Sequence, residues 1–141
     1  MTRPEREAFL ADTHVGLLAV ATDGRGPLLV PVWYDYTPGG AIRIVTGGTS
    51  HKARLIRRTG RASLCVQTET APYRYVSVEG PATVAGAPDF ERDVRPTALR
   101  YLGAQLGEAY LALTAGERAA SVLVTLTPER WLSVDYHKMS A

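Results

Sequence analysis

Residues 42–66 read IRIVTGGTSHKARLIRRTGRASLCV, and two apolar runs in this stretch flank a glycine pair and a basic segment. Alternating apolar residues predict a strand over 41–46, which the glycine pair ends. Thr49 or Ser50 can cap a helix made of HKARLIRR, and Gly60 is suited to terminate it. RASLCVQTE predicts the next strand. The stretch therefore predicts a strand–loop–helix–strand unit.

The positive charge of this unit has two alternative uses. Residues 46–61 contain one lysine, four arginines and a histidine. Such a run is commonly the solvated face of a helix, whose apolar side would be Ala53, Leu55 and Ile56. The alternative is an anion site, because a glycine pair admits a ligand to the backbone and a helix N-terminus presents free N–H groups.

An anion site in this unit would have several donors. Thr49 and Ser50 supply hydroxyl groups, and Lys52 brings a full charge near the second helical position. Arg54 or Arg57 can add the planar fork that binds phosphate through two hydrogen bonds.

The whole chain has the composition of a globular protein with a single domain, residues 1–141. It is 45% hydrophobic and 21% charged, and its length is enough to bury roughly 70% of the unfolded surface. The net charge of +2 is too small for a dedicated nucleic-acid binder. Only Lys52 and Lys138 are lysines among 16 basic residues, so Lys52 marks a site where arginine is not used.

Cysteine content and the N-terminal sequence bear on the compartment. Cys65 is the single cysteine, which excludes an intramolecular disulfide, and its apolar neighbours predict an inert core thiol. The N-terminal segment carries acids where a signal peptide is basic, and VGLLAVA is too short to span a bilayer. We therefore expect a cytoplasmic protein with no membrane partner.

Turn residues and periodicity predict the other strands. Asp23-Gly24 is a hairpin signature, and Gly80-Pro81 indicates a bulge or bend within a strand. Pro31 cannot donate to a ladder, so its strand is expected to be unpaired on one side or bulged. With the unit above, we expect strands over 14–21, 27–36, 41–46, 61–69, 73–86, 121–127 and 131–136.

Helices are expected over 3–10, 51–58 and 97–113. The last has apolar residues at spacings of three and four and would run for about five turns. Gly103 and Gly107 lie four residues apart in it and can form a notch for close packing.

Six or seven short strands with two internal helices fit neither a β-sandwich nor a doubly wound sheet. The first three strands are expected to form an antiparallel meander. We predict a mainly β (α+β) fold, a small antiparallel barrel with helical insertions.

Several enzyme classes have no motif in the chain. His14, His51 and His137 lie far apart, and neither HExxH nor a cysteine pair occurs, so we expect no metal site. A nucleophile elbow, a dinucleotide fingerprint and a Walker sequence are also missing. We assign no catalytic residue.

The order VPVWYDY, IRIVTGGTSHKARLIRRTGRASLCV and YVSVEGPATV resembles the split-barrel flavin-binding superfamily of pyridoxamine 5′-phosphate oxidase-like proteins. The resemblance covers Val15 to Val84 and is closest to the small coenzyme F420-dependent reductases. It implies a six- or seven-stranded antiparallel split β-barrel that forms a homodimer with cofactor sites at the interface. Many members carry an arginine beside the lysine, where this chain has Ser50 and His51, so its phosphate cup is less cationic.

The resemblance also implies which residues hold the cofactor. Its phosphate would lie at the end of the third strand and the start of the next helix, and its ring along the second and third strands. The partner subunit would bring Tyr73, Arg74, Tyr75 or Trp131, each of which can equally serve packing, as can Trp33. The implied cofactor-binding residues are Val30, Pro31, Val32, Trp33, Val45, Thr46, Thr49, Ser50, His51, Lys52, Arg54 and Arg57.

An oxidoreductase is the function that this resemblance implies, with hydride passing from C5 of reduced F420 to a small unsaturated substrate. Tyr34, Tyr36 or water could supply the proton. FMN is the alternative cofactor. F420 has a longer anionic tail, which Arg57, Arg58 and Arg61 would attract, and this favours F420.

Two functions of other classes stay open. The first is a non-catalytic protein that stores or senses the cofactor. The second is a nucleic-acid-binding barrel with KARLIRRTGR as its basic footprint. Such barrels stack bases on aromatic side chains, and residues 46–72 contain none, so we expect no nucleic-acid partner.

Overall fold

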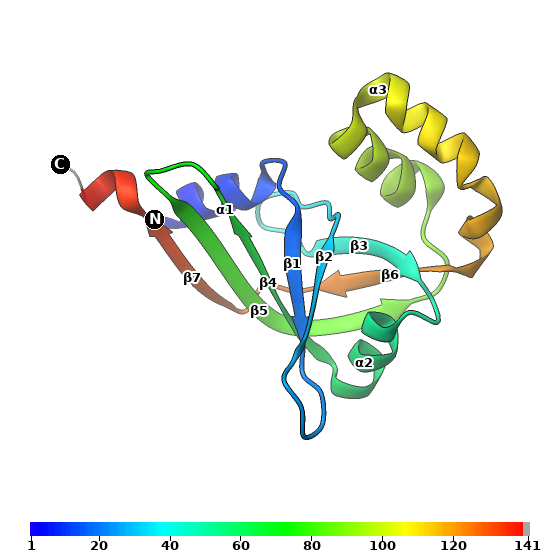
Figure 1. Cartoon of the computed structure of the whole chain (residues 1–141), viewed down its shortest axis with the longest axis horizontal. Coiled ribbons are helices and arrows are strands. Elements are labelled where there is room, and N and C mark those ends of the chain that lie inside the picture. Colours follow the sequence, from blue (N-terminus) through cyan, green and yellow to red (C-terminus); the bar gives the residue numbers. More distant parts are fainter. Residues whose placement is uncertain (140–141) are drawn as a thin grey trace.

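The computed structural model describes residues 1–139, whose seven strands form one curled antiparallel sheet, a split β-barrel with helical insertions (Figure 1). None of the described helices combines the length and hydropathy needed to cross a bilayer. The helices are α1 (Arg3–Ala11), α2 (His51–Thr59) and α3 (Arg95–Leu113), with a π-helical turn at Phe90–Val94 and 3-10 turns at Ala115–Ala120 and Tyr136–Met139. The strands are β1 (Gly16–Val20), β2 (Leu28–Val32), β3 (Ile42–Gly47), β4 (Arg61–Gln67), β5 (Arg74–Ala85), β6 (Ser121–Leu126) and β7 (Arg130–Asp135).

The long strand β5 joins the two parts of the sheet. Its first half pairs with β4 and β7, and its end pairs with β6, so β5 curves from one part to the other (Figure 1). Gly80 lies where the partner changes, and a Cβ there would be 1.8 Å from the Thr127 carbonyl oxygen. Only glycine lets these backbones meet. The bend expected at Gly80-Pro81 is confirmed.

The barrel is split between β2 and β3, which are the two ends of the strand order β2-β1-β4-β5-β6-β3. We call this gap the seam. One end of the seam is closed by a bridge in which the backbone N–H groups of Asp35 and Arg43 each donate to the other residue's carbonyl, both at 2.9 Å. The expected three-strand meander is therefore wrong at its third strand, because β3 pairs along its length with β6. The expected unpaired side of the Pro31 strand is confirmed, since β2 is an edge.

Helix α2 agrees with its sequence signals. Ser50 is the N-cap and its Oγ accepts from the Ala53 amide at 3.3 Å. Gly60 ends the helix in the left-handed conformation, with φ of 69°. Ala53, Leu55 and Ile56 are buried, so the apolar side of the helix is fixed to the barrel and the charged side is left outside.

Helix α3 differs from the single straight helix that we expected. Gly103 has φ of 79° and ψ of 174°, a conformation that essentially only glycine adopts, and it divides α3 into two segments (Figure 1). A Cβ at the buried Gly107 would lie 2.7 Å from Leu99 Cδ2. Gly107 is thus a packing notch, as predicted, whereas Gly103 is the break.

Buried Asp93 ties this helical insertion to β3. Its carboxylate, with no exposed side-chain surface, accepts from Arg92 Nε and Nη2 at 2.9 and 2.8 Å and lies 3.6 Å from Arg43 Nε. Arg43 also donates from Nη2 to Asp35 at 2.6 Å. The hydrogen bonds from Arg92 hold the pKa of Asp93 below its ordinary value.

Candidate functional site

The loop between β3 and α2 is held by its glycines in a way that the sequence did not indicate. The Gly48 amide donates to the Ala120 carbonyl at 2.8 Å, and the Gly48 carbonyl accepts from Arg57 at 2.6 Å. A Cβ at Gly48 would lie 3.1 Å from Val122. Gly48 therefore serves close packing within the protein, and Gly47, which has open space at its Cβ position, is the glycine that leaves room for a ligand.

Basic side chains along α2 divide into two groups, according to whether they have a partner among the described residues. The first group has partners. Arg57 donates to Gly48, Arg58 pairs with Asp23, and Arg61, just after α2, pairs with Glu129.

The second group lies at the start of α2. Within residues 1–139, the side chains of His51, Lys52 and Arg54 form no hydrogen bond or ion pair with the protein. Thr49 is exposed beside them, and the Ser50 hydroxyl keeps its proton free to donate while its oxygen caps the helix. The predicted phosphate donors thus gather at one helix N-terminus with free cationic groups.

The residues predicted for the ring lie on both sides of the barrel wall. Pro31 is exposed and Val45 and Val30 are half-buried along the seam. Val32 and Thr46 are buried, so their backbone alone is available to a ligand outside.

Trp33 has a different environment from the rest of this set. Its ring stacks on Tyr101 of α3 at 5.0 Å between centroids and 5° between planes, and lies 5.4 Å from the Tyr110 ring. Of the two roles considered for Trp33, packing is the one that these contacts describe.

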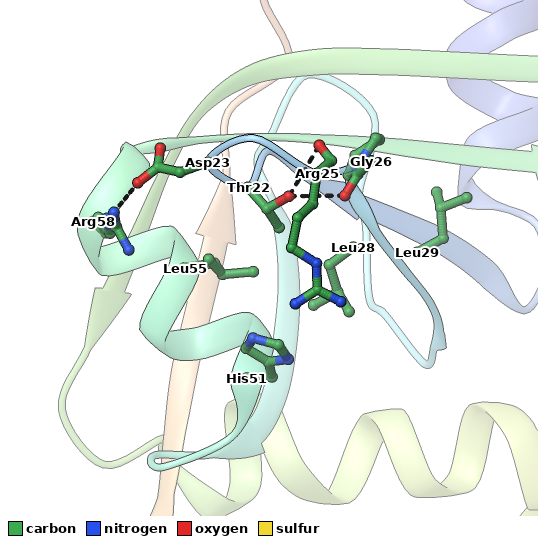
Figure 2. Close-up of a pocket in the computed structure, with 10 residues that line it drawn as sticks. Thr22, Asp23, Arg25, Gly26, Leu28, Leu29, His51, Leu55 and Arg58 are labelled. Atoms are coloured by element: carbon green, nitrogen blue, oxygen red, sulfur yellow. Dashed lines mark hydrogen bonds and ion pairs between the residues drawn. The ribbon is translucent and has the colours of Figure 1, made fainter.

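A pocket of about 400 Å³ lies between α2 and the turn that joins β1 to β2 (Figure 2). Leucine side chains and basic side chains share its lining. Of the twelve residues predicted for the cofactor, His51 alone lines it. The lining residues are Thr22, Asp23, Arg25, Gly26, Pro27, Leu28, Leu29, His51, Leu55 and Arg58.

Sequence reasoning missed the turn side of this pocket. The Asp23-Gly24 signature locates the turn in the chain, but its position against α2 depends on how the β1–β2 hairpin leans over the barrel. No local pattern carries that information; the basic Arg25 in the turn is the one residue that could have drawn attention to it.

Two tyrosines considered as proton donors face the core. The Tyr34 hydroxyl is fully buried and donates to the Leu10 carbonyl at 2.7 Å, and burial raises its pKa far above the ordinary value. Tyr36 is also buried and its pKa is likewise raised. Neither tyrosine lines the pocket beside α2.

The side of the sheet that faces away from the core carries exposed leucines among polar side chains; we call it the outer sheet face. Leu17, Leu29 and Leu132 are 44%, 57% and 61% exposed on it. Cys65 lies half-buried on this face and pairs with Leu17, so the expected core location of this thiol is wrong. Desolvation still raises the pKa of Cys65, which keeps it protonated. The cross-strand row on this face is Pro31, Leu17, Cys65, Ser77 and Leu132.

The partner-chain candidates lie at the β7 side of the molecule. Tyr73 is 52% exposed and Tyr75 is half-buried on the outer sheet face. Arg74 lies over the Phe9 ring at 5.0 Å, and Trp131 lies under Arg6 at 4.7 Å, so both already have packing roles within the chain.

Comparison with known proteins agrees with this architecture. The structure resembles the conserved hypothetical protein Rv2991 from Mycobacterium tuberculosis, with 27% identity and a TM-score of 0.82 over 100% of this chain and 89% of that chain. An F420 reductase has 20% identity and a TM-score of 0.64 over 89% and 94% of the two chains. A FAD-binding protein from Mesorhizobium loti has 21% identity and a TM-score of 0.64 over 94% and 93%. The last two likenesses show the fold alone.

A search of curated proteins found no match. The family model for pyridoxamine 5′-phosphate oxidase matches residues 2–135. Because that match covers nearly the whole chain, this chain belongs to the pyridoxamine 5′-phosphate oxidase family of split-barrel proteins.

Proposed function

We propose that this protein is an oxidoreductase that binds coenzyme F420 at the seam and reduces a small unsaturated substrate. The observation that carries the proposal is a group of basic side chains, His51, Lys52 and Arg54, that have no partner among residues 1–139 and lie at the α2 N-terminus beside the open seam. Two likenesses support it: one similar structure is an F420 reductase and another binds FAD. When bound, the cofactor would supply the hydride.

The α2 N-terminus would bind the cofactor's phosphate. Its first backbone N–H groups and the helix dipole favour an anion. Lys52 would add a full charge, and the Thr49 and Ser50 hydroxyl groups would donate hydrogen bonds. The residues present fit the group, because these cations have no competing carboxylate in residues 1–139.

The seam would hold the ring. As an edge strand, β2 has backbone groups that β1 does not use, and these can bind the polar edge of a flavin-like ring. Pro31 and Val45 would contact its face from opposite sides of the seam. Buried Val32 and Thr46 would support this wall from within, and the exposed Arg57 would hold the loop before α2 through the Gly48 carbonyl.

A second copy of the chain would cover the outer sheet face and complete the site. Leu29 belongs both to this face and to the pocket lining, so a partner packed on the leucines would reach the site and exclude water from it. The exposed Tyr73 and the half-buried Tyr75 are the side chains that it could bring. Leu132→Arg should convert a homodimer to a monomer in analytical ultracentrifugation, whereas an unchanged mass would place the interface elsewhere.

Cofactor titration by calorimetry tests the proposal, with Lys52→Ala as the variant. We expect Lys52→Ala to weaken F420 binding by about 1–3 kcal/mol, the range for losing a hydrogen bond to a charged group. The matched control is Lys138→Ala, which removes the other lysine, paired with Glu5. Equal affinity in wild type and Lys52→Ala would make α2 a plain surface helix. Tighter binding of FMN than of F420 would reverse the choice of cofactor.

Catalysis needs a separate measurement. Oxidation of reduced F420 is followed with a panel of enones, quinones and tetrapyrroles, and the proposal expects acceleration with at least one class. Tight binding without acceleration of any would favour the alternative, a non-catalytic protein that stores or senses the cofactor.

A further inference from the structure

The pocket beside α2 extends beyond the predicted phosphate site toward the β1–β2 turn. Arg25 projects its guanidinium from this turn into the pocket, between Leu28 and His51 (Figure 2). Among residues 1–139, Arg25 has no side-chain hydrogen bond or ion pair. The Thr22 hydroxyl donates to the carbonyls of Arg25 and Gly26 at 3.2 and 2.8 Å, which fixes the backbone of the turn that carries the exposed Arg25 side chain.

Arg58 also lines this pocket and forms an ion pair with Asp23 of the turn (Figure 2). The two side chains are 65% and 79% exposed. An ion pair this open to water contributes little, typically about 0–1 kcal/mol. A ligand anion can therefore displace the Asp23 carboxylate from Arg58 at small cost.

The spacing along α2 separates this cation from the phosphate site. Arg58 comes six residues after Lys52, which corresponds to a rise of about 9 Å along a helix axis. The leucines of the pocket, Leu28 and Leu55, lie between the turn and the helix. One phosphate cannot reach both cations, but a longer molecule with a second anionic group can.

We propose that Arg25 and Arg58 form a second anion subsite, which takes an anionic extension of the ligand, and that Asp23 is an internal competitor for it. The ligand class is a molecule whose second anionic group, carboxylate or phosphate, lies about 9 Å or more from its first. The inference rests on the proposed function for the position of the first group. Asp23 then sets the preference between ligands. A ligand with an anionic extension displaces the Asp23 carboxylate and gains contacts with Arg25 and Arg58, whereas a ligand with a single phosphate gains neither.

Paired titrations of F420, which has such an extension, and FMN, which does not, test the subsite. Arg25→Gln and Arg58→Gln should each weaken F420 binding by roughly tenfold, as for loss of a charge-assisted contact, and leave FMN binding unchanged. Asp23→Asn should strengthen F420 binding by about twofold to fivefold. The controls are Arg61→Gln and Glu129→Gln, which alter a half-exposed ion pair whose residues do not line the pocket.

A second arm needs no cofactor. Tripolyphosphate and citrate are titrated while the amide signals of Gly24 and Gly26 are followed by NMR, which separates phosphate from carboxylate as the preferred anion. Shifts that saturate, and that weaken in Arg25→Gln, support the subsite even where neither F420 nor FMN binds; in that case the cofactor proposal fails alone.

The converse result overturns the subsite alone. If F420 binding depends on Lys52 but Arg25→Gln and Arg58→Gln leave it unchanged, the turn is not part of the site. Equal effects of Asp23→Asn and Glu129→Gln would likewise reduce Asp23 to an ordinary surface charge.

Discussion

The basic residues around α3 and those at the start of α2 are used in opposite ways. Around α3 the protein supplies the partners: Arg43 and Arg92 bind Asp93, and Arg100 donates to the Ala11 and Asp12 carbonyls at 2.9 and 2.6 Å. At the start of α2 the described chain supplies none for His51, Lys52 and Arg54. Arginine count alone does not separate these regions. The location of the acceptors does: it gives the arginines around α3 a structural role, and it is the basis on which we propose ligand binding at α2.

Removal of the Asp93 carboxylate should have the largest effect on stability that this comparison predicts. Asp93→Asn leaves Arg43 and Arg92 without their buried anion, and we expect the free energy of unfolding to fall by about 3 kcal/mol in urea denaturation. Glu129→Gln, in an exposed pair, is the control and should cost less than about 1 kcal/mol. Equal costs for the two variants would remove the structural role assigned to the α3 network.

Arg100 carries the next largest effect. Its guanidinium holds the end of α1 through two carbonyl acceptors, so Arg100→Ala should cost about 2 kcal/mol of unfolding free energy. Arg95→Ala removes an arginine of the same helix from an exposed pair with Glu108, and its cost should stay below about 1 kcal/mol. The reverse ranking would contradict the contrast.

Acid should unfold the protein partly through Asp93. The pKa of this carboxyl lies below 3.8, its value without the fold, so its contribution to stability is complete above 3.8 and is lost as pH falls through the lower folded value. Unfolding free energies of wild type should therefore drop more steeply below about pH 4 than those of Asp93→Asn. Parallel pH profiles would show that Asp93 titrates as an ordinary carboxyl.

The smallest effect on stability is expected at α2. Lys52 has no partner among residues 1–139, so Lys52→Ala should change the unfolding free energy by less than about 0.5 kcal/mol. Its thermal denaturation curve should overlay that of wild type. A clear loss of stability would mean that Lys52 serves the fold, as Arg100 does.

Local signals predicted the strand–loop–helix–strand unit well. The Ser50 cap, the apolar side of α2 and the Gly60 terminator depend on neighbours in sequence, and the structure has all of them. The bend at Gly80 was also readable, because glycine followed by proline interrupts a ladder wherever it occurs.

Non-local packing explains what the sequence could not indicate. The partner of β3 is β6, whose pairing residues start at Ser121, so hairpin rules misplaced it. Helical periodicity continues across Gly103 and hides the break there. Two further features depend on how separate segments pack together: the pocket wall formed by Asp23 and Arg25, and the hydrogen bond from Arg57 to the Gly48 carbonyl. No local pattern predicts such packing.

A crystal structure of the protein soaked with coenzyme F420 tests the central claim most directly. The account predicts the phosphate at the α2 N-terminus, within hydrogen-bond distance of Lys52 Nζ, and the ring along the seam beside Pro31 and Val45. A cofactor bound elsewhere, with side chains of the protein filling the seam, would contradict it.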